Sequence, residues 1–117
     1  MTFTSNDYDR AILPFTDDNC TLIESKDKWK TYRLGRKYDH ITSGDDVYVV
    51  NSDTGDVVTE VQIKERREVE FSQLPLDEEG HESYESKDHQ RKVFNDYYSY
   101  IGRDIRYDDT FLVFTFE

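Results

Sequence analysis

The final apolar run of the chain, residues 110–116, reads Thr-Phe-Leu-Val-Phe-Thr-Phe and carries apolar side chains at both odd and even positions. Successive residues of a β-strand point to opposite faces of the sheet, so this run predicts a strand that is covered on both faces. Such a strand belongs in the centre of a sheet, with other elements packed above and below it. The run therefore restricts the chain to folds with a buried sheet.

A hairpin supplies two further strands. Residues 57–63 place Val, Thr, Val and Ile on one face, which is the pattern of a half-buried strand. The strand is expected to continue to Phe71, with a β-bulge among the charged residues 65–68. Residues 51–56 are polar and contain a glycine, so they predict the turn that connects this strand to a short one at 47–50.

Two shorter runs complete the predicted sheet. Residues 29–34 are rich in aromatic and β-branched side chains and predict a strand that ends at Gly35. Residues 11–15 are apolar but contain Pro14, which lacks the N–H group that an inner strand needs. The second run is therefore expected at an edge of the sheet or at the end of a strand.

Two helices are predicted. The first, residues 17–26, follows a capping residue at Thr16 or Asp17 and is expected to turn Leu22 and Ile23 inward. The second, residues 87–101, begins after the N-cap Ser86 and ends before Gly102. Its apolar stripe is expected to contain Val93, Phe94, Tyr97, Tyr98 and Ile101.

The predicted order is β-α-β-β-β-α-β, in which strands outnumber helices and the hairpin makes at least one pair antiparallel. This order indicates an α+β fold with a curled or barrel-like sheet. A chain of 117 residues forms one domain, and its 15% aromatic content can fill a core despite 35% charged residues. Residues 1–10 are polar and are expected to be flexible.

Several kinds of site and location are disfavoured. The single cysteine, Cys20, excludes an internal disulfide and a cysteine-based zinc site, and the three histidines lack metal-ligand spacing. We therefore expect no metal and no cofactor. Neither a membrane-length apolar run nor a signal pattern occurs, so a cytoplasmic location without a membrane partner is expected.

The charge distribution is uneven. Six of the 15 lysines and arginines lie in residues 26–37 of a chain whose net charge is -11. The acidic total argues against non-specific binding of long nucleic acid, which needs a broad basic face. A local basic pocket for one nucleotide remains compatible with it, and so does an acidic surface that imitates nucleic acid.

Short motifs follow one another along the chain. The basic strand carries Lys-Thr-x-Arg at 30–33, and Ile-x-x-Gly-Asp at 41–45 precedes a valine-rich strand. Phe-x-x-Leu at 71–74 precedes His-x-x-x-Glu at 81–85, and a tyrosine-bearing helix precedes the terminal strand. In this order the motifs resemble the ASCH domain, of the PUA-like superfamily. The resemblance spans residues 11–117.

The resemblance implies a single domain, residues 1–117, with a PUA-like curled sheet or β-barrel of about five to six strands and two main helices. It also implies an association with RNA, nucleotides or modified nucleosides, because families of this type have such ligands.

Some small bacterial members of the family are 4-acetylcytidine amidohydrolases. For these the resemblance implies a catalytic Lys on the basic strand, a Thr two or three residues later and a Glu after the central hairpin. Lys30 matches the Lys, and Glu85, or less closely Glu82, matches the Glu. The Thr position falls on Arg33, whereas Thr31 lies next to Lys30 and is expected on the opposite face of the strand.

The expected site is a cleft between the basic strand and residues 81–85. On a regular strand Lys28 and Lys30 share a face, and Arg33 points the other way. Aromatic rings between the cations suit stacking on a base. The expected ligand-binding residues are Lys28, Trp29, Lys30, Thr31, Arg33, Arg36, Tyr38, His81 and Glu82.

Three functions stay open on this basis. The first is binding of RNA, a nucleotide or a modified nucleoside in the basic cleft. The second is an amidohydrolase that acts on an acylated nucleoside such as 4-acetylcytidine. The third is an acidic protein of viral type that binds a basic protein partner or mimics nucleic acid, which the acidic run at 77–85 supports.

Overall fold

The computed structural model describes residues 11–35 and 37–117. The expectation of a flexible segment at 1–10 and the assignment of Arg36 to the site lie outside these residues. The described chain follows the predicted order of strands and helices. In sequence the elements are β1 (Ala11–Phe15), α2 (Asp17–Glu24), β2 (Lys30–Leu34), β3 (Asp46–Asn51), β4 (Val57–Glu70), η1 (Phe71–Gln73), α3 (Lys87–Tyr97), η2 (Ser99–Ile101) and β5 (Thr110–Phe116), where η marks a 3₁₀-helix.

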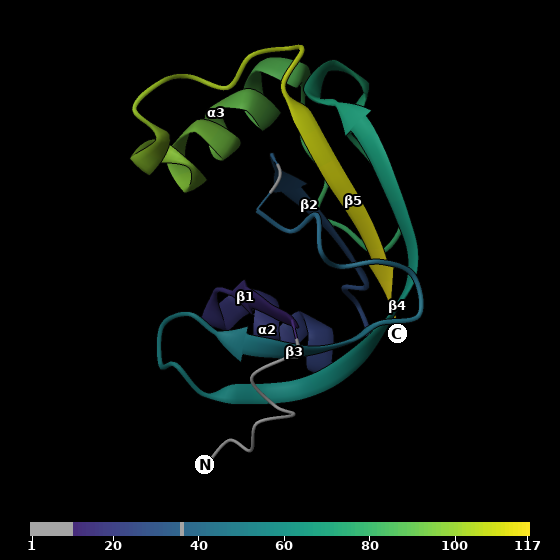
Figure 1. Ribbon diagram of the computed structural model, residues 1–117. Helices are drawn as coiled ribbons and strands as arrows, with labels where there is room; N and C mark the ends of the chain where they lie inside the picture. The colour runs from purple at the N-terminus through teal and green to yellow at the C-terminus, as the bar shows by residue number, and fades with distance from the viewer. Residues whose placement is uncertain (1–10, 36) are drawn as a thin grey trace.

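The five strands form one sheet in the order β1-β3-β4-β5-β2. β1 pairs with β3 in parallel, and every other neighbouring pair is antiparallel. β1 therefore lies at an edge, as Pro14 predicted, and β5 lies inside the sheet. Figure 1 shows the sheet curling into a half-barrel, with β1 and β3 crossing below β2 and β5. The α+β curled-sheet prediction is confirmed.

The long strand β4 produces this curl. Its first half pairs with β3 and its second half with β5. The register with β5 shifts between Ile63 and Glu65, which is the irregularity of a β-bulge. A bulge bends its strand and increases the local twist, so β4 serves both halves of the sheet. The sequence placed this bulge slightly later, at residues 65–68.

The two halves of the sheet enclose two apolar cores, and β5 contributes to both. Its residues Leu112, Phe114 and Phe116 pack into the core under β1, β3 and α2. Phe111 and Val113 pack into a second core together with residues of η1 and α3. Because alternate side chains enter different cores, both faces of β5 are apolar, as the sequence indicated.

The first helix is shorter than predicted. α2 ends at Glu24, and Lys26 then adopts a φ of 71°, which no helix interior allows. Ile23 is buried, but Leu22 is 38% exposed, so the prediction that both turn inward is wrong for Leu22. Cys20 and Ile23, three residues apart, define the buried face, and Leu22 lies beside it.

The second helix begins as predicted but ends early. The Ser86 Oγ accepts a hydrogen bond from the His89 N–H at 3.0 Å, so Ser86 is the N-cap. α3 ends at Tyr97, and Gly102, with a φ of 77°, terminates η2 instead. Phe94 is buried, but Tyr97 is 52% exposed, so the predicted stripe is wrong at that position.

Among the described residues, no helix has the length and apolar character needed to cross a membrane.

Candidate functional site

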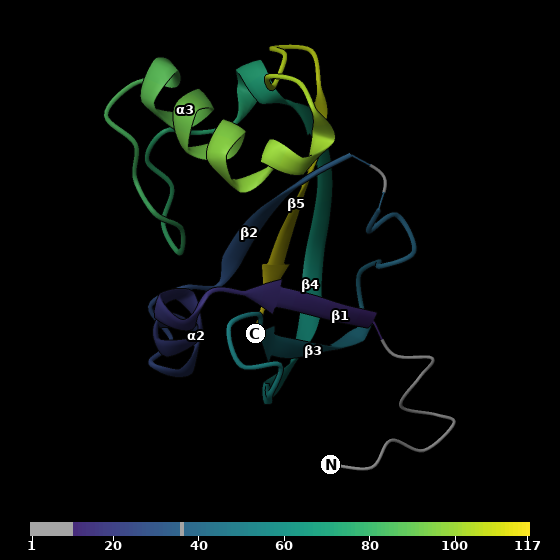
Figure 2. The ribbon, with the colours of Figure 1, turned by 90° about the vertical axis from the view of Figure 1, so that its left-hand side faces the viewer.

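A cavity of about 380 Å³ lies between the two edges of the sheet and the end of α3. The end of β1, Lys28, residues 31–33, the loop 81–84 and the tyrosines at 97–100 are among the residues that line it. Figure 2 shows β2 passing between α3 above and the β1–α2 layer below, which are the elements that supply the lining. We call it the Lys28–Glu82 cavity, after the ion pair within it.

The start of β2 decides which side chains enter this cavity. The N–H groups of Trp29 and Lys30 both donate to the carbonyl of Gly80, at 2.9 and 3.1 Å. Two successive donors on one acceptor are the mark of a β-bulge, which displaces the alternation of faces by one residue. The side chain of Lys28 therefore lies with Thr31 and Arg33, all of which line the cavity.

The bulge corrects one prediction directly. The prediction that Lys28 and Lys30 share one face of the strand is wrong. The Nζ atom of Lys30 forms an ion pair with Glu78, and the Tyr32 hydroxyl donates to the same carboxylate at 2.5 Å. Lys30 and Tyr32 thus have a common partner outside the Lys28–Glu82 pair, as residues two apart on a regular strand do. The expectation that Lys30 and Arg33 point opposite ways agrees with this arrangement.

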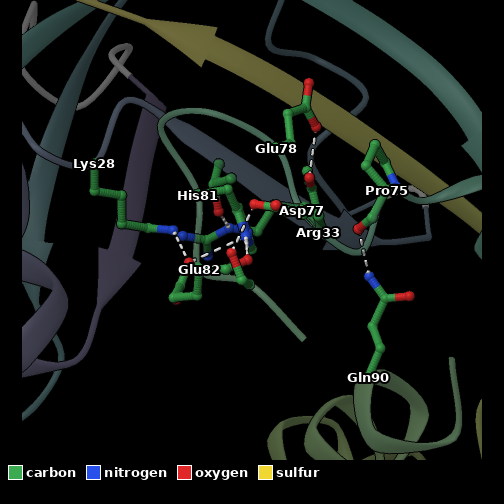
Figure 3. Close-up of polar contacts among 11 residues, drawn as sticks. Lys28, Arg33, Pro75, Asp77, Glu78, His81, Glu82 and Gln90 are labelled. Carbon is green, nitrogen blue, oxygen red and sulfur yellow. Dashed lines mark hydrogen bonds and ion pairs between the residues drawn. The ribbon is translucent and has the colours of Figure 1, made fainter. Parts of the chain in front are cut away.

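The central contact is an ion pair between Lys28 and Glu82. The Lys28 Nζ lies 2.6 Å from Glu82 Oε2, and the Lys28 side chain is only 4% exposed (Figure 3). Burial lowers the pKa of Lys28; the carboxylate of Glu82 opposes this shift and nearby Arg33 adds to it. Burial raises the pKa of Glu82, but the opposing interactions, chiefly the charge of Lys28, hold that pKa below its usual value.

His81 is a neutral partner of this pair. Its ring stacks on Tyr32, with centroids 3.8 Å apart and planes 7° from parallel. Burial and the charge of Lys28 lower the pKa of His81 to about 4, although Glu82 opposes them. Nδ1 lies 3.1 Å from both the carbonyl and Oε2 of Glu82. Both neighbours are acceptors, so we assign the single proton of the neutral ring to Nδ1.

Arg33 joins the two edges of the curled sheet. Its Nη2 donates to the Pro14 carbonyl at 2.8 Å, and its Nε donates to Thr31 Oγ1 at 2.9 Å. The guanidinium lies over the rings of Phe15 and Tyr38, with its carbon 4.5 and 5.3 Å from the ring centroids. No described carboxylate forms an ion pair with it. Arg33 therefore both closes the half-barrel and adds positive charge to the cavity.

The cavity is cationic although the chain is acidic. Lys28 and Arg33 are buried in its wall, and Lys37 is exposed at its mouth. Glu82 is the one carboxylate among the described lining residues. With His81 neutral, positive charge exceeds negative charge. A ligand that carries a phosphate or several hydrogen-bond acceptors suits such a site.

The loop that carries His81 and Glu82 is held at both ends. The Lys87 Nζ donates to the carbonyls of Phe71 and Leu74, both at 2.9 Å. The Gln90 amide donates to the Pro75 carbonyl at 3.0 Å (Figure 3). Further along the loop, Glu78 binds Lys30 and Tyr32 of β2. These contacts fix the loop relative to both α3 and β2.

The structure brings most of the expected residues together. Trp29 is half-buried and lines a different cavity, of about 550 Å³. Lys30 is engaged by Glu78, and Glu85 is exposed and is not among the lining residues. Arg36 lies outside the described residues. The expected residues that do line the Lys28–Glu82 cavity are Lys28, Thr31, Arg33, Tyr38, His81 and Glu82.

Sequence reasoning missed the aromatic wall. Tyr84, Tyr97, Tyr98 and Tyr100 all line the cavity, together with Phe15 of β1. A signal was present, because three of the four residues at 97–100 are tyrosine. The helical period assigned two of them to a core stripe instead.

In the part of the chain that the structure describes, no group of three or more His, Cys, Asp or Glu side chains is arranged to hold a metal ion.

Comparison with known proteins identifies the fold. No family model and no curated protein matches the sequence. Among solved structures, an ASCH domain from Lactobacillus crispatus JV V101 is similar, with a TM-score of 0.63, 18% identity, and 92% of this chain and 79% of that chain covered. A DUF984 protein from Enterococcus faecalis V583 has a TM-score of 0.68 and 12% identity, with 92% and 74% covered. The ASCH-like fold predicted from the sequence motifs is thereby confirmed.

Proposed function

We propose that this chain, which has the fold of an ASCH domain, binds a nucleoside or nucleotide in the Lys28–Glu82 cavity. The observation that carries the proposal is a cationic, aromatic-lined cavity in a chain of net charge -11. The wall of this cavity departs from the acidic character of the chain, because two buried cations, Lys28 and Arg33, lie in it. Their placement is what an anionic or acceptor-rich ligand requires.

The chemistry of the wall fits a nucleoside in three respects. The volume of about 380 Å³ lies in the range of small-ligand pockets. The tyrosine rings offer faces on which a base stacks. The Glu82 carboxylate can accept from an exocyclic amino group or a ribose hydroxyl, and Arg33 and Lys28 can donate to base carbonyls or phosphate.

Calorimetric titration with cytidine 5′-monophosphate tests the binding proposal. Saturable binding is expected in the wild type, and Lys28→Met is expected to weaken it at least about tenfold, because the variant removes a buried cation. Lys92→Met is the control, since Lys92 is an exposed residue of α3. Folding of each variant is checked by its unfolding midpoint. Absence of wild-type binding, or unchanged affinity in a folded Lys28→Met, would contradict the proposal.

A second candidate function, amide hydrolysis, gains support from one observation. Lys28, Thr31 and Glu82 all line the cavity, and Thr31 follows Lys28 by three positions. This is the arrangement of Lys, Thr and Glu that the ASCH resemblance implies for nucleoside amidohydrolases. When Lys30 and Glu85 are taken as the Lys and the Glu, the Thr position falls on Arg33, which has no hydroxyl. Because the bulge at Trp29 and Lys30 brings Lys28 to the side of Thr31, Lys28, Thr31 and Glu82 form an alternative match.

The proposed reaction uses the Thr31 hydroxyl as nucleophile. Its Oγ1 accepts from Arg33 Nε, which leaves the hydroxyl hydrogen available to a base. Lys28 is a cation in its ion pair with Glu82, but burial lowers its pKa, so it releases its proton more readily than an exposed lysine and its amine can then take the proton of Thr31. Thr31 Oγ1 then adds to the amide carbonyl, the carbon–nitrogen bond breaks, and the proton passes to the leaving amine. Water hydrolyses the acyl-threonine ester and releases the acid.

Product analysis with 4-acetylcytidine separates this reaction from binding alone. The wild type is expected to release cytidine and acetate, Thr31→Ser is expected to retain part of the activity, and Thr31→Val is expected to release none. Cytidine affinity of Thr31→Val is measured beside its activity, because the Thr31 hydroxyl also accepts from Arg33 Nε and loss of chemistry must be separated from loss of binding. If the wild type releases no cytidine, the hydrolase candidate is excluded and the binding proposal stands on its own titration.

A further inference from the structure

We propose that the cavity of about 550 Å³ that Trp29 lines is a second binding site, which takes an α-amino acid with an apolar side chain. We call it the Trp29 cavity. Of the described lining residues, Lys28 alone lines both this cavity and the Lys28–Glu82 cavity, and its ammonium is paired with Glu82. The proposal is therefore independent of the function proposed above.

Apolar side chains from three elements line the Trp29 cavity. Ile23 comes from α2, Val58 and Val61 come from β4, and Phe116 comes from β5. Ile23, Val61 and Phe116 are buried residues of the first core, so the cavity reaches down to that core. Its volume lies in the range of small-ligand pockets. An apolar side chain of a ligand is removed from water in such a place, which favours binding.

Trp29 offers a ring and a hydrogen-bond donor to this cavity. The ring is half-buried and lies against the backbone of Gly80, where a Cβ would come within 2.4 Å of it. The indole N–H has no hydrogen-bond partner among the described residues, and it is not a buried atom. A ligand can therefore pack on the indole and accept from its N–H group.

Two residues at the end of α2 are locally unfavourable, and both line the cavity. Lys26 has a φ of 71°, in the left-handed region that usually takes glycine after a helix. Glu24 is the last residue of α2, where the partial negative charge of the helix end disfavours a carboxylate. Residues that break local rules cluster at functional sites. Their common place at the cavity therefore favours a ligand-binding role.

Glu24 and Lys26 also offer charges of opposite sign. Neither the carboxylate of Glu24 nor the ammonium of Lys26 has an ion pair or a hydrogen bond with a described residue. Lys64, in contrast, lies 3.7 Å from Glu117. An α-amino acid carries one ammonium and one carboxylate, so it can pair with both open charges at once. A purely anionic or purely cationic ligand would leave one of them unpaired.

The fluorescence of Trp29 reports on this cavity, because Trp29 is the only tryptophan of the chain. Titration with phenylalanine is expected to give a saturable change. Glycine, which has no apolar side chain, is expected to give none. N-acetylphenylalanine lacks the ammonium and phenylalaninamide lacks the carboxylate, so each is expected to bind about tenfold more weakly than phenylalanine.

Lys26→Gly and Glu24→Gln test the two charges. Each is expected to weaken phenylalanine binding at least about fivefold without lowering the thermal unfolding midpoint. Glycine tolerates the positive φ, and glutamine removes the carboxylate from the helix end. A merely structural role would lower the midpoint instead. Lys92→Gln and Glu85→Gln are the matched controls, because both residues are exposed and lie outside the lining, and both variants are expected to keep the affinity.

Calorimetry on the same samples detects binding that leaves the fluorescence unchanged. Absence of binding, binding without a change in Trp29 fluorescence, or equal affinity for phenylalanine and its two blocked forms overturns the proposal. Unchanged affinity in either Lys26→Gly or Glu24→Gln overturns it as well. None of these outcomes decides whether cytidine 5′-monophosphate binds in the Lys28–Glu82 cavity.

Discussion

Burial and a nearby cation hold His81 neutral. The side chain is buried, Tyr32 covers one face of the imidazole, and Lys28 contacts the same Glu82 oxygen as His81 does. A protonated His81 would place a second positive charge beside Lys28 with only Glu82, and more distantly Glu78, to compensate. At the scale of single residues, burial and the charge of Lys28 therefore disfavour the protonated form of His81.

This position predicts a pH dependence of stability. The folded pKa of His81, about 4, lies below its usual 6.5, so the unfolded chain binds the proton more tightly. The free energy of unfolding therefore carries no penalty from His81 above about pH 6.5. It falls as the pH drops from 6.5 toward 4, because proton binding to His81 then favours the unfolded chain. Urea unfolding at about pH 7.5 and about pH 5 should show a loss of about 2 kcal/mol in the wild type that His81→Gln does not show.

His40→Gln serves as the control for this measurement, because His40 is exposed. It should lose as much stability on acidification as the wild type does. Equal losses in the wild type and in His81→Gln would show that His81 is protonated as easily in the fold as in the unfolded chain.

The loop at residues 74–86 is the element on which the site depends most. It contains no helix or strand, yet Lys87, Gln90, Lys30 and Tyr32 each hold it by hydrogen bonds. Its backbone contacts the start of β2 at Gly80, whose carbonyl accepts from Trp29 and Lys30 and whose φ is 85°. A Cβ at this position would lie 2.4 Å from the Trp29 ring. The loop can lie this close to β2 only because residue 80 has no side chain.

Gly80→Ala is therefore expected to destabilise the protein and to weaken cytidine 5′-monophosphate binding. Positive φ alone costs an alanine roughly 1 kcal/mol, and the overlap with Trp29 adds about 1–3 kcal/mol. The unfolding free energy in urea and the calorimetric affinity measure the two effects. Movement of the loop would displace His81 and Glu82 from the cavity.

Gly55→Ala separates the two costs. Gly55 has a similar φ of 80°, but nothing lies within 4 Å of a Cβ built on it. This variant should lose only the conformational part and should bind the mononucleotide normally. If both alanine variants lose the same stability, the contact between Gly80 and Trp29 has no energetic importance.

At the scale of the whole molecule, the excess of carboxylates destabilises the folded state by mutual repulsion. The net charge is -11, and the radius of gyration is 14.3 Å. The screening length is about 30 Å at 0.01 M salt and about 10 Å at 0.1 M. The carboxylates therefore repel one another across the entire molecule at low salt and only locally at higher salt.

The thermal unfolding midpoint is expected to rise between about 0.01 M and about 0.1 M sodium chloride, by roughly 4 °C for each kcal/mol of repulsion that is screened. Scanning calorimetry measures the shift. Near the isoelectric point, about 4.6, the rise should shrink because net repulsion is small. A midpoint that falls with salt at neutral pH would indicate that ion pairs such as Lys28–Glu82 outweigh the global repulsion.

The sequence alone determined the order of the elements and the class of fold. The two apolar faces of 110–116, Pro14 at an edge and Ser86 as a cap are local signals, and the structure confirms each of them. The alternation at 57–63 is confirmed for Val61 and Ile63, whereas at its start, where the register with β3 shifts, Val58 packs against the core in place of Val57. Local signals are reliable here because hydrogen bonding and side-chain direction within one element depend on adjacent residues. The last turns of both helices were predicted less well. Leu22 and Tyr97 follow the helical period of apolar residues, but no neighbouring element buries them.

The membership of the site was decided by tertiary structure. Lys28 joins Thr31 because the N–H groups of Trp29 and Lys30 share the carbonyl of Gly80, far along the sequence. No pattern within residues 26–37 contains that bulge, so regular alternation selected Lys30 instead. Glu82 and not Glu85 lines the cavity for a similar reason, because contacts with β2 and α3 position the loop. The sequence supplied the charged and aromatic groups, and long-range hydrogen bonds determined which of them face one another.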